Sequence, residues 1–358
     1  MANWRNQGCR ADLESGFYGL RAVTLENEKL RVVALPDKGA DIVAFQHKPS
    51  DTDFMWISPM GLRDPASSIP SGPKEDGFFL DFYEGAWQEI LPSGGPNASY
   101  KGADWGLHGE TATIPWDFRL LADSEKEIAV EFSVKLYRSP FKLTRVMRLE
   151  AGRPVLFMRE RLENEGAEAM EYMWGHHPAV GEPWLDESCL VDCPASKLIL
   201  NPGHYSDNQR FADDVTCAWP MAPAKDGATV DLRFVPPRSL KTLDLGYLAE
   251  LDAGWYGVTS TSKGTGFGMA WDKEIFPYVW YWQNFGGGFG YPWYGRTYNL
   301  ALEPWTSWPG DGLNAAIEKG TARCLQAGES LETELVAVAY EGRSHVKHIS
   351  RAGEVELA

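Results

Sequence analysis

The sequence lacks the features that direct a protein into a membrane or onto a nucleic acid. It contains no run of about 18 apolar residues, the length that a membrane-spanning helix requires. Residues 1–6 have no apolar signal segment. Lys and Arg number 34 against 50 Asp and Glu, a formal net charge of −16, and the cations form no cluster. Because nucleic acids and anionic membranes favour clustered cations, we expect neither partner and place the protein in the cytoplasm.

Cysteine is also scarce. The five cysteines are odd in number and scattered, which suits free thiols in a reducing compartment better than a disulfide framework. Cys189 and Cys193 have three residues between them, but no second pair completes a zinc site. A metal site built from His176, His177 and a carboxylate is disfavoured, because adjacent histidines on an extended segment cannot easily reach one ion. We therefore expect no bound metal.

Helical periodicity is almost absent, and short runs rich in β-branched residues take its place. Strands are expected at residues 20–25, 30–35, 41–45, 111–121, 127–137, 141–149, 155–162, 169–174, 254–258, 266–271, 298–303 and 333–339. Strands at this spacing are typical of an all-β protein. No shift in composition and no internal repeat divides the chain, so we expect one domain over residues 1–358, a large antiparallel β-sandwich. Residues 60–77 are expected to form a surface loop or lid, and residues 183–226 are irregular.

Aromatic residues are abundant, with 15 Trp, 14 Tyr and 16 Phe. Their faces can stack on sugar rings in a cleft, although tryptophan is also common in the cores of sandwiches. The densest patch spans residues 276–285. In an extended strand, alternation puts Tyr278, Trp280 and Trp282 on one face, which can line a pocket.

The stretch from Trp174 to Val180 holds two of only seven histidines. Gly175 and Pro178 flank His176 and His177, so we interpret the segment as a strand end breaking into a tight loop. Histidine titrates near neutral pH, which makes the loop a candidate acid/base site. The alternative is one buried structural ring and one exposed ring.

Two other positions are candidates for the same chemistry. His108 lies between Gly106 and Gly109 in a stretch typical of cleft-lining loops, although a turn histidine facing water is the alternative. Glu303 ends a strand between Leu302 and Pro304. Apolar neighbours would raise its pKa toward that of a useful base, unless it faces solvent on an edge strand.

Three short motifs occur in order along the chain: Leu107-His108-Gly109, His177-Pro178 and Leu302-Glu303-Pro304. On these motifs the chain resembles a divergent member of the aldose 1-epimerase (galactose mutarotase) family. The resemblance implies a β-supersandwich and cofactor-independent interconversion of the α and β anomers of a free sugar. It implies His177 as the acid, Glu303 as the base, and His108 as a partner of the ring oxygen.

The expected sugar-binding set combines His108 with residues from the aromatic and glycine-rich stretches. Its other members are Trp87, Gln88, His176, Tyr278, Trp280, Trp282, Arg296 and Trp305. The chain departs from the family's pattern at residues 85–89, where the family has an Asn-Arg pair, and after Pro178. The acidic sugar-binding residue of the family has three candidates here, Asp244, Asp252 and Asp272. An acidic sugar held by Arg296 or Lys38 is an alternative substrate.

Two further functions fit the same residues. A non-catalytic carbohydrate-binding protein would use the aromatic cleft without the acid/base pair. A glycoside hydrolase needs two carboxyl groups at a defined separation, for which Glu89, Glu110 and Glu303 are available.

Overall fold

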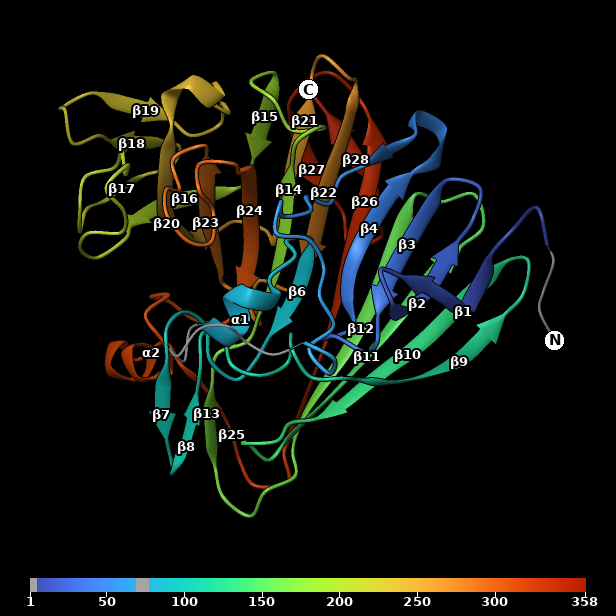
Figure 1. The fold of residues 1–358 in the computed structure, drawn as a ribbon. Coiled ribbons are helices and arrows are strands. Elements are labelled where there is room, and N and C mark those ends of the chain that lie inside the picture. The colour runs from blue at the N-terminus through green and yellow to red at the C-terminus, as the bar shows by residue number, and fades with distance from the viewer. Residues whose placement is uncertain (1–4, 69–76) are drawn as a thin grey trace.

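The computed structural model describes residues 5–68 and 77–358, and two large antiparallel sheets dominate it (Figure 1). The expected all-β sandwich is confirmed. The larger sheet runs in the spatial order β1 (Arg10–Phe17), β2 (Leu20–Glu26), β3 (Leu30–Leu35), β4 (Asp41–His47), β6 (Trp87–Ile90), β14 (Gly175–Gly181), β24 (Tyr298–Trp305), β23 (Tyr278–Phe285), β20 (Thr242–Leu251), β16 (Ala195–Leu200) and β17 (Thr216–Ala218), with β5 (Thr52–Asp53) beside β4.

The smaller sheet packs against the first. Its order is β15 (Cys189–Asp192), β21 (Trp255–Ser260), β22 (Thr265–Trp271), β26 (Ser330–Glu341), β12 (Val155–Asn164), β11 (Phe141–Glu150), β10 (Glu127–Lys135) and β9 (Asp117–Asp123). In β11, buried and half-buried residues alternate without exception, which is the pattern of a strand with one face on the core. A buried apolar cluster with members from both sheets, including Phe45, Met147 and Phe267, joins them.

Shorter elements lie outside the two large sheets. They are the two-stranded pairs β7 (Ala98–Tyr100) with β8 (Ala103–Trp105), β13 (Met170–Tyr172) with β25 (Arg323–Leu325), β18 (Met221–Pro223) with β19 (Thr229–Asp231) and β27 (Val346–Ile349) with β28 (Val355–Leu357), the helices α1 (Gly77–Phe82) and α2 (Leu313–Lys319), and the 3-10 turns η1 (Lys48–Ser50) and η2 (Arg238–Leu240). Within the described residues, no helix has the length and apolar character needed to cross a membrane. Figure 1 places α1 beside the ends of β6 and β24.

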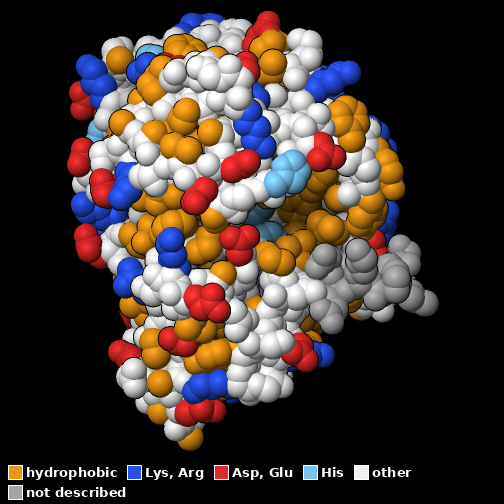
Figure 2. Space-filling view, turned by 90° about the vertical axis from the view of Figure 1, so that its left-hand side faces the viewer, with side chains coloured by type: hydrophobic (Ala, Val, Ile, Leu, Met, Phe, Trp, Pro, Cys, Tyr) orange, Lys and Arg blue, Asp and Glu red, His pale blue; other side chains and the backbone are white. Residues whose placement is uncertain are grey.

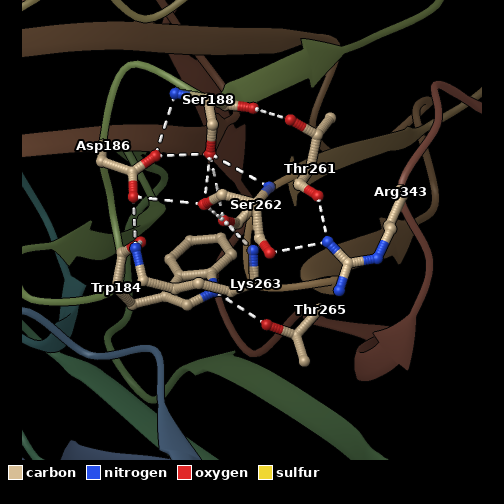
Figure 3. A network of polar contacts seen from close by, with 9 residues as sticks. Trp184, Asp186, Ser188, Thr261, Ser262, Lys263, Thr265 and Arg343 are labelled. Atoms are coloured by element: carbon tan, nitrogen blue, oxygen red, sulfur yellow. Dashed lines mark hydrogen bonds and ion pairs between the residues drawn. The ribbon is translucent and has the colours of Figure 1, made fainter.

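A polar network fixes the turn that joins β21 to β22 (Figure 3). Asp186 accepts hydrogen bonds from the backbone N–H and the hydroxyl of Ser188 and forms an ion pair with Lys263. Lys263 also donates to the carbonyl of Trp184, 2.9 Å away, and the indole of Trp184 donates to the Thr265 hydroxyl at 3.0 Å. These contacts tie the loop that leaves β14 to the smaller sheet.

Four expectations about elements need correction. The segment around His176 and His177 is not a loop: β14 is a strand of the larger sheet whose residues are all buried. Glu303 does not end its strand, since β24 continues to Trp305. The strand expected at residues 111–121 starts only at Asp117. Residues 183–226 include strands β15 to β18. Of the expected loop or lid at 60–77, residues 60–68 contain no strand, α1 starts at Gly77, and residues 69–76 lie outside the described part.

Candidate active site

His177 and Glu303 face each other across two neighbouring strands. Strand β14 pairs with β24 through Gly175 opposite Trp305 and Ala179 opposite Ala301, a register that puts His177 opposite Glu303. Their closest atoms, Nε2 of His177 and Oε1 of Glu303, lie 3.4 Å apart. Both side chains are buried. The sheet therefore brings together two titratable groups that are far apart in the sequence.

The glycine before the two histidines has a packing role. A Cβ at Gly175 would lie 2.2 Å from the ring of Trp305, so no larger residue fits without a shift of that ring. Trp305 stacks on Trp280 with 3.9 Å between ring centroids and donates from its indole N–H to Oε2 of Glu303 at 2.9 Å. Gly175 thus permits the approach of the tryptophan that holds Glu303 in place.

The pair lies in a cavity of about 340 Å³. Figure 2 shows a hollow on this face of the molecule, lined largely by hydrophobic side chains with histidine visible within it. The described lining residues are Phe79, Leu80, Tyr83, Gly95, Pro96, Leu107, His108, His177, Tyr205, Leu245, Trp280, Trp282, Tyr291, Pro292, Trp293, Glu303 and Gly310. The volume lies at the lower end of the range for small-molecule sites. Five of the expected site residues share it: His108, His177, Trp280, Trp282 and Glu303.

Burial holds both members of the pair in their neutral forms. Desolvation raises the pKa of Glu303 to about 8, although the hydrogen bond from Trp305 partly opposes the rise. Desolvation lowers the pKa of His177 to about 4. At pH 7 the two groups together therefore hold one proton, which resides on Glu303.

His108 presents a fixed donor to the cavity. Its backbone has a positive φ of 63°, and its Nδ1 accepts a hydrogen bond from the N–H of Gly95 at 3.1 Å. Desolvation, followed by the nearby His177, lowers the pKa of His108 to about 3, so the ring is neutral and its proton is on Nε2. The rings of His108 and His177 are 5.7 Å apart between centroids.

Three tyrosines that the sequence analysis did not single out, Tyr83, Tyr205 and Tyr291, also line the cavity. The hydroxyl of Tyr83 lies 3.4 Å from Nδ1 of His177, and its ring stacks on Phe79 at 5.3 Å. The next residue, Glu84, is buried in an ion pair with Lys38, which fixes the chain here. The aromatic run from Phe78 to Tyr83 was a signal that could have found this tyrosine. Tyr205 comes from a loop with no such pattern.

Three expected binding residues lie in the protein interior instead of in the cavity. The indole of Trp87 donates to Nδ1 of His176 at 3.3 Å, and Nε2 of His176 lies 3.1 Å from a carboxylate oxygen of Glu160. The amide of Gln88 donates to Oε1 of Glu84 at 3.3 Å. Adjacent side chains of a strand point to opposite faces, so His176 turns away from the cavity that His177 lines.

The other three expected residues lie around the cavity without lining it. Tyr278 is half-buried with its ring 6.4 Å from that of Trp308, and Trp305 lies behind Trp280. Arg296 is exposed and lines a different hollow with Arg63. Lys38, the alternative anchor for an acidic sugar, is buried between Asp41 and Glu84.

None of the three aspartates proposed as the acidic sugar-binding residue reaches the cavity. Asp244 is buried in an ion pair with Arg210 at 2.7 Å, Asp252 is exposed, and Asp272 lies 3.4 Å from Arg351. Among the described lining residues, Glu303 supplies the only carboxylate. The paired carboxyl groups of a glycoside hydrolase are therefore not present around this cavity in the described part of the chain.

A cluster in the interior brings together three residues of types that can bind a metal ion. The ligand atoms of Glu89, Glu160 and His176 lie within 4.8 Å of one another. Arg145 pairs with Glu89 at 3.2 Å, so the cluster already contains a buried cation. Desolvation raises the pKa of each glutamate to about 7 and lowers that of His176 to about 4. None of these groups lines the cavity.

Comparisons with known proteins agree with this architecture. A family model described as "Domain of unknown function (DUF4432)" matches residues 18–338. A search of curated proteins gives no match.

Several solved structures share the fold. One is a proposed aldose 1-epimerase from Klebsiella pneumoniae, with 17% identity, a TM-score of 0.72, and coverage of 94% of this chain and 84% of that chain. A galactose mutarotase related enzyme from Lactobacillus acidophilus has 17% identity, a TM-score of 0.59, and coverage of 92% and 100%. A galactose mutarotase-like protein from Clostridium acetobutylicum has 14% identity, a TM-score of 0.61, and coverage of 93% and 99%. At these identities the likeness establishes the fold.

Proposed function

The chain belongs to the family described as "Domain of unknown function (DUF4432)", and we propose that it is an aldose 1-epimerase, which interconverts the α and β anomers of a free sugar. One observation carries this proposal. His177 and Glu303, 3.4 Å apart, are buried in a cavity of single-sugar size whose walls are largely aromatic. Mutarotation needs one group that donates a proton while another accepts one, and these two groups meet that need.

The proton count of the pair fits the reaction. One group takes the proton of the anomeric hydroxyl while the other gives a proton to the ring oxygen, so the ring C–O bond breaks and the open-chain aldehyde forms. After rotation about the C1–C2 bond, the two groups exchange roles and the ring closes as the other anomer. A pair that holds one proton can start this cycle with His177 as acid and Glu303 as base once the proton crosses the 3.4 Å between them. No proton is consumed overall.

The neighbouring side chains support these roles. The Nε2–H of His108 is a donor for an oxygen of the bound sugar. The Tyr83 oxygen can accept the Nδ1–H that His177 carries when it is protonated, which favours the imidazolium at the moment of transfer. Trp280, Trp282 and Trp293 offer faces on which a sugar ring can stack.

The five cysteines are all free thiols. This is the state expected in a reducing compartment, and it supports our placement of the activity in the cytoplasm.

The test is exchange NMR of anomer interconversion over a panel of neutral and acidic aldoses. We expect at least one sugar to be accelerated, and Glu303→Gln or His177→Asn to reduce the rate by about 10²–10⁴-fold. His348→Asn, at an exposed histidine, is the matched control and should keep full activity. Saturable sugar binding without any acceleration would identify a carbohydrate-binding protein instead.

A further inference from the structure

The side chains around the cavity are unusually poor in groups that bind sugar hydroxyls. No Asn, Gln, Asp, Ser, Thr, Lys or Arg occurs among the described lining residues. These side chains are the ones with several donors or acceptors in one head group, or with a small rotatable hydroxyl. Their absence from the described lining limits how many hydroxyl groups a buried sugar can satisfy.

Several of the polar atoms that do line the cavity already have partners. The indole N–H of Trp280 donates to the carbonyl of Ser307 at 2.9 Å. The Tyr291 hydroxyl donates to the carboxylate of Asp81. Trp282 hydrogen-bonds Tyr205. The two indoles therefore have no donor left for a ligand, whereas the Tyr291 oxygen can still accept a hydrogen bond.

The remaining polar groups gather around the acid/base pair. Tyr83 contacts His177, and desolvation, followed by the carboxyl of Glu303, raises the pKa of both Tyr83 and Tyr205. His108 can only donate from Nε2, because Gly95 occupies its Nδ1. Sugar hydroxyls are donors as well as acceptors, so beyond the pair the side chains offer chiefly the three phenol oxygens of Tyr83, Tyr205 and Tyr291 to receive them.

The rest of the described lining is apolar. Phe79, Leu80, Pro96, Leu107 and Leu245 contribute only carbon atoms from their side chains. A hydroxyl placed against them would lose its water without gaining a partner, whereas a methyl group or a hydrogen would lose nothing.

We propose that this cavity binds a deoxy aldose, a sugar in which hydrogen replaces one hydroxyl group of the parent hexose. At carbon 6 this replacement leaves a methyl group. The inference rests on the proposed function, since it assigns the ring oxygen and the anomeric hydroxyl to His177 and Glu303. The apolar side chains then receive the position that lacks the hydroxyl. Apolar pockets discriminate against one added hydroxyl by about a hundredfold at most, which sets the upper limit of the expected preference.

The test compares matched sugars in binding, independently of catalysis. Trp280, Trp282 and Trp293 line the cavity, so tryptophan fluorescence reports occupancy. Glucose, galactose and mannose are titrated beside their 2-deoxy and 6-deoxy counterparts in both the D and the L series. We expect at least one deoxy sugar to bind roughly tenfold to a hundredfold more tightly than its parent. Parents that bind as tightly as all their deoxy counterparts would overturn the inference.

Two leucines on one strand provide a variant and its control. Leu245→Asn adds an amide to the cavity wall, whereas Leu243→Asn makes the same change two residues away on the same face of β20, outside the lining. We expect Leu245→Asn to reduce the deoxy preference roughly two- to tenfold, the effect of one hydrogen bond, and Leu243→Asn to leave it unchanged. Equal ratios in both variants and the wild type would contradict the role of this wall.

Exchange NMR on the same sugars separates the two proposals. A deoxy preference in binding without anomer exchange supports the substrate class and rejects the epimerase. Anomer exchange at equal efficiency for the parent and the deoxy sugars supports the epimerase and rejects the deoxy substrate class. A protein that binds none of these sugars contradicts both proposals.

Discussion

Replacement of Trp305 by phenylalanine tests how the site sets the proton affinity of Glu303. The indole N–H of Trp305 donates to Oε2 of Glu303 at 2.9 Å, and the ring stacks almost parallel to Trp280, at 13°. Trp305→Phe keeps an aromatic ring against Trp280 but removes the N–H. The carboxylate then loses a donor that stabilised its charged form, so the pKa of Glu303 must rise above its present value of about 8.

The size of the shift follows from the two protonation states. A hydrogen bond to a charged group contributes about 1.5–3 kcal/mol and one to a neutral group about 0.5–1.5 kcal/mol. The difference, roughly 1–1.5 kcal/mol, corresponds to about one pKa unit. In the proposed reaction the pair acts with one proton, and Glu303 loses that proton as the pH rises, so the activity should fall on the alkaline side. The alkaline limb of the pH–rate profile should therefore move to higher pH by about one unit in the Trp305→Phe variant.

The assay is the rate of anomer exchange from pH 5 to pH 10 with the best sugar of the panel, together with a ¹³C titration of the Glu303 carboxyl. Trp308→Phe is the matched control. Its ring contacts Tyr247 and Tyr278, and the indole hydrogen bond to Glu303 comes from Trp305, so the limb should stay in place. An alkaline limb that stays put or moves downward in Trp305→Phe would refute the assignment of that limb to Glu303.

Three further changes test other parts of the structure. Tyr83→Phe removes the partner of Nδ1 of His177, so the pKa of that ring should fall below about 4 and the rate should drop up to about tenfold, as measured by NMR titration and exchange; an unchanged histidine titration would contradict the contact. Arg145→Met leaves Glu89 buried without its cation and should cost about 3–5 kcal/mol in urea unfolding, while the rate per folded molecule stays the same; unchanged stability would show that the pair is not stabilising. Cys324 is exposed and should react first with a thiol reagent, ahead of the four less accessible cysteines, as followed by mass spectrometry; a faster reaction at any buried thiol would contradict the packing around it.

Where one face of a strand meets the core, the sequence predicts the element well. Residues 141–149 were expected as a strand, and β11 spans Phe141–Glu150 with strict alternation of burial. The expected strand 155–162 lies within β12, whose burial alternates from Leu156 to Asn164. Both strands have one face toward the interior and one toward solvent, so apolar and polar residues alternate along the sequence with a period of two.

The alternation of apolar and polar residues is absent where a strand is buried on both faces, so the sequence does not predict such a strand well. Every residue of β14 is buried, so no alternation marks it. Gly175 permits the close approach of Trp305, and Pro178 lies between Gly175 and Ala179, where β14 does not pair with β24. Glycine and proline usually signal a turn. Here packing and a gap in the strand ladder explain them, and neither can be recognised without the neighbouring strand.

The limits at the site have the same origin. His177 and Glu303 carry a local signal, because each residue type and its neighbours indicate acid/base chemistry. Tyr83 carries only the signal of the aromatic run that it ends, and Tyr205 carries none. What matters for both is their distance from His177 and Glu303, and only the assembled sheet and its loops determine that distance. The alternation of side chains along a strand also distinguishes His176 from His177. Once Trp174 to Val180 is a strand, its two histidines must face opposite ways, so a cavity on one side can receive only one of them. The histidine pair by itself therefore leaves two candidate rings. The family resemblance implies His177, and the sheet places that ring 3.4 Å from Glu303.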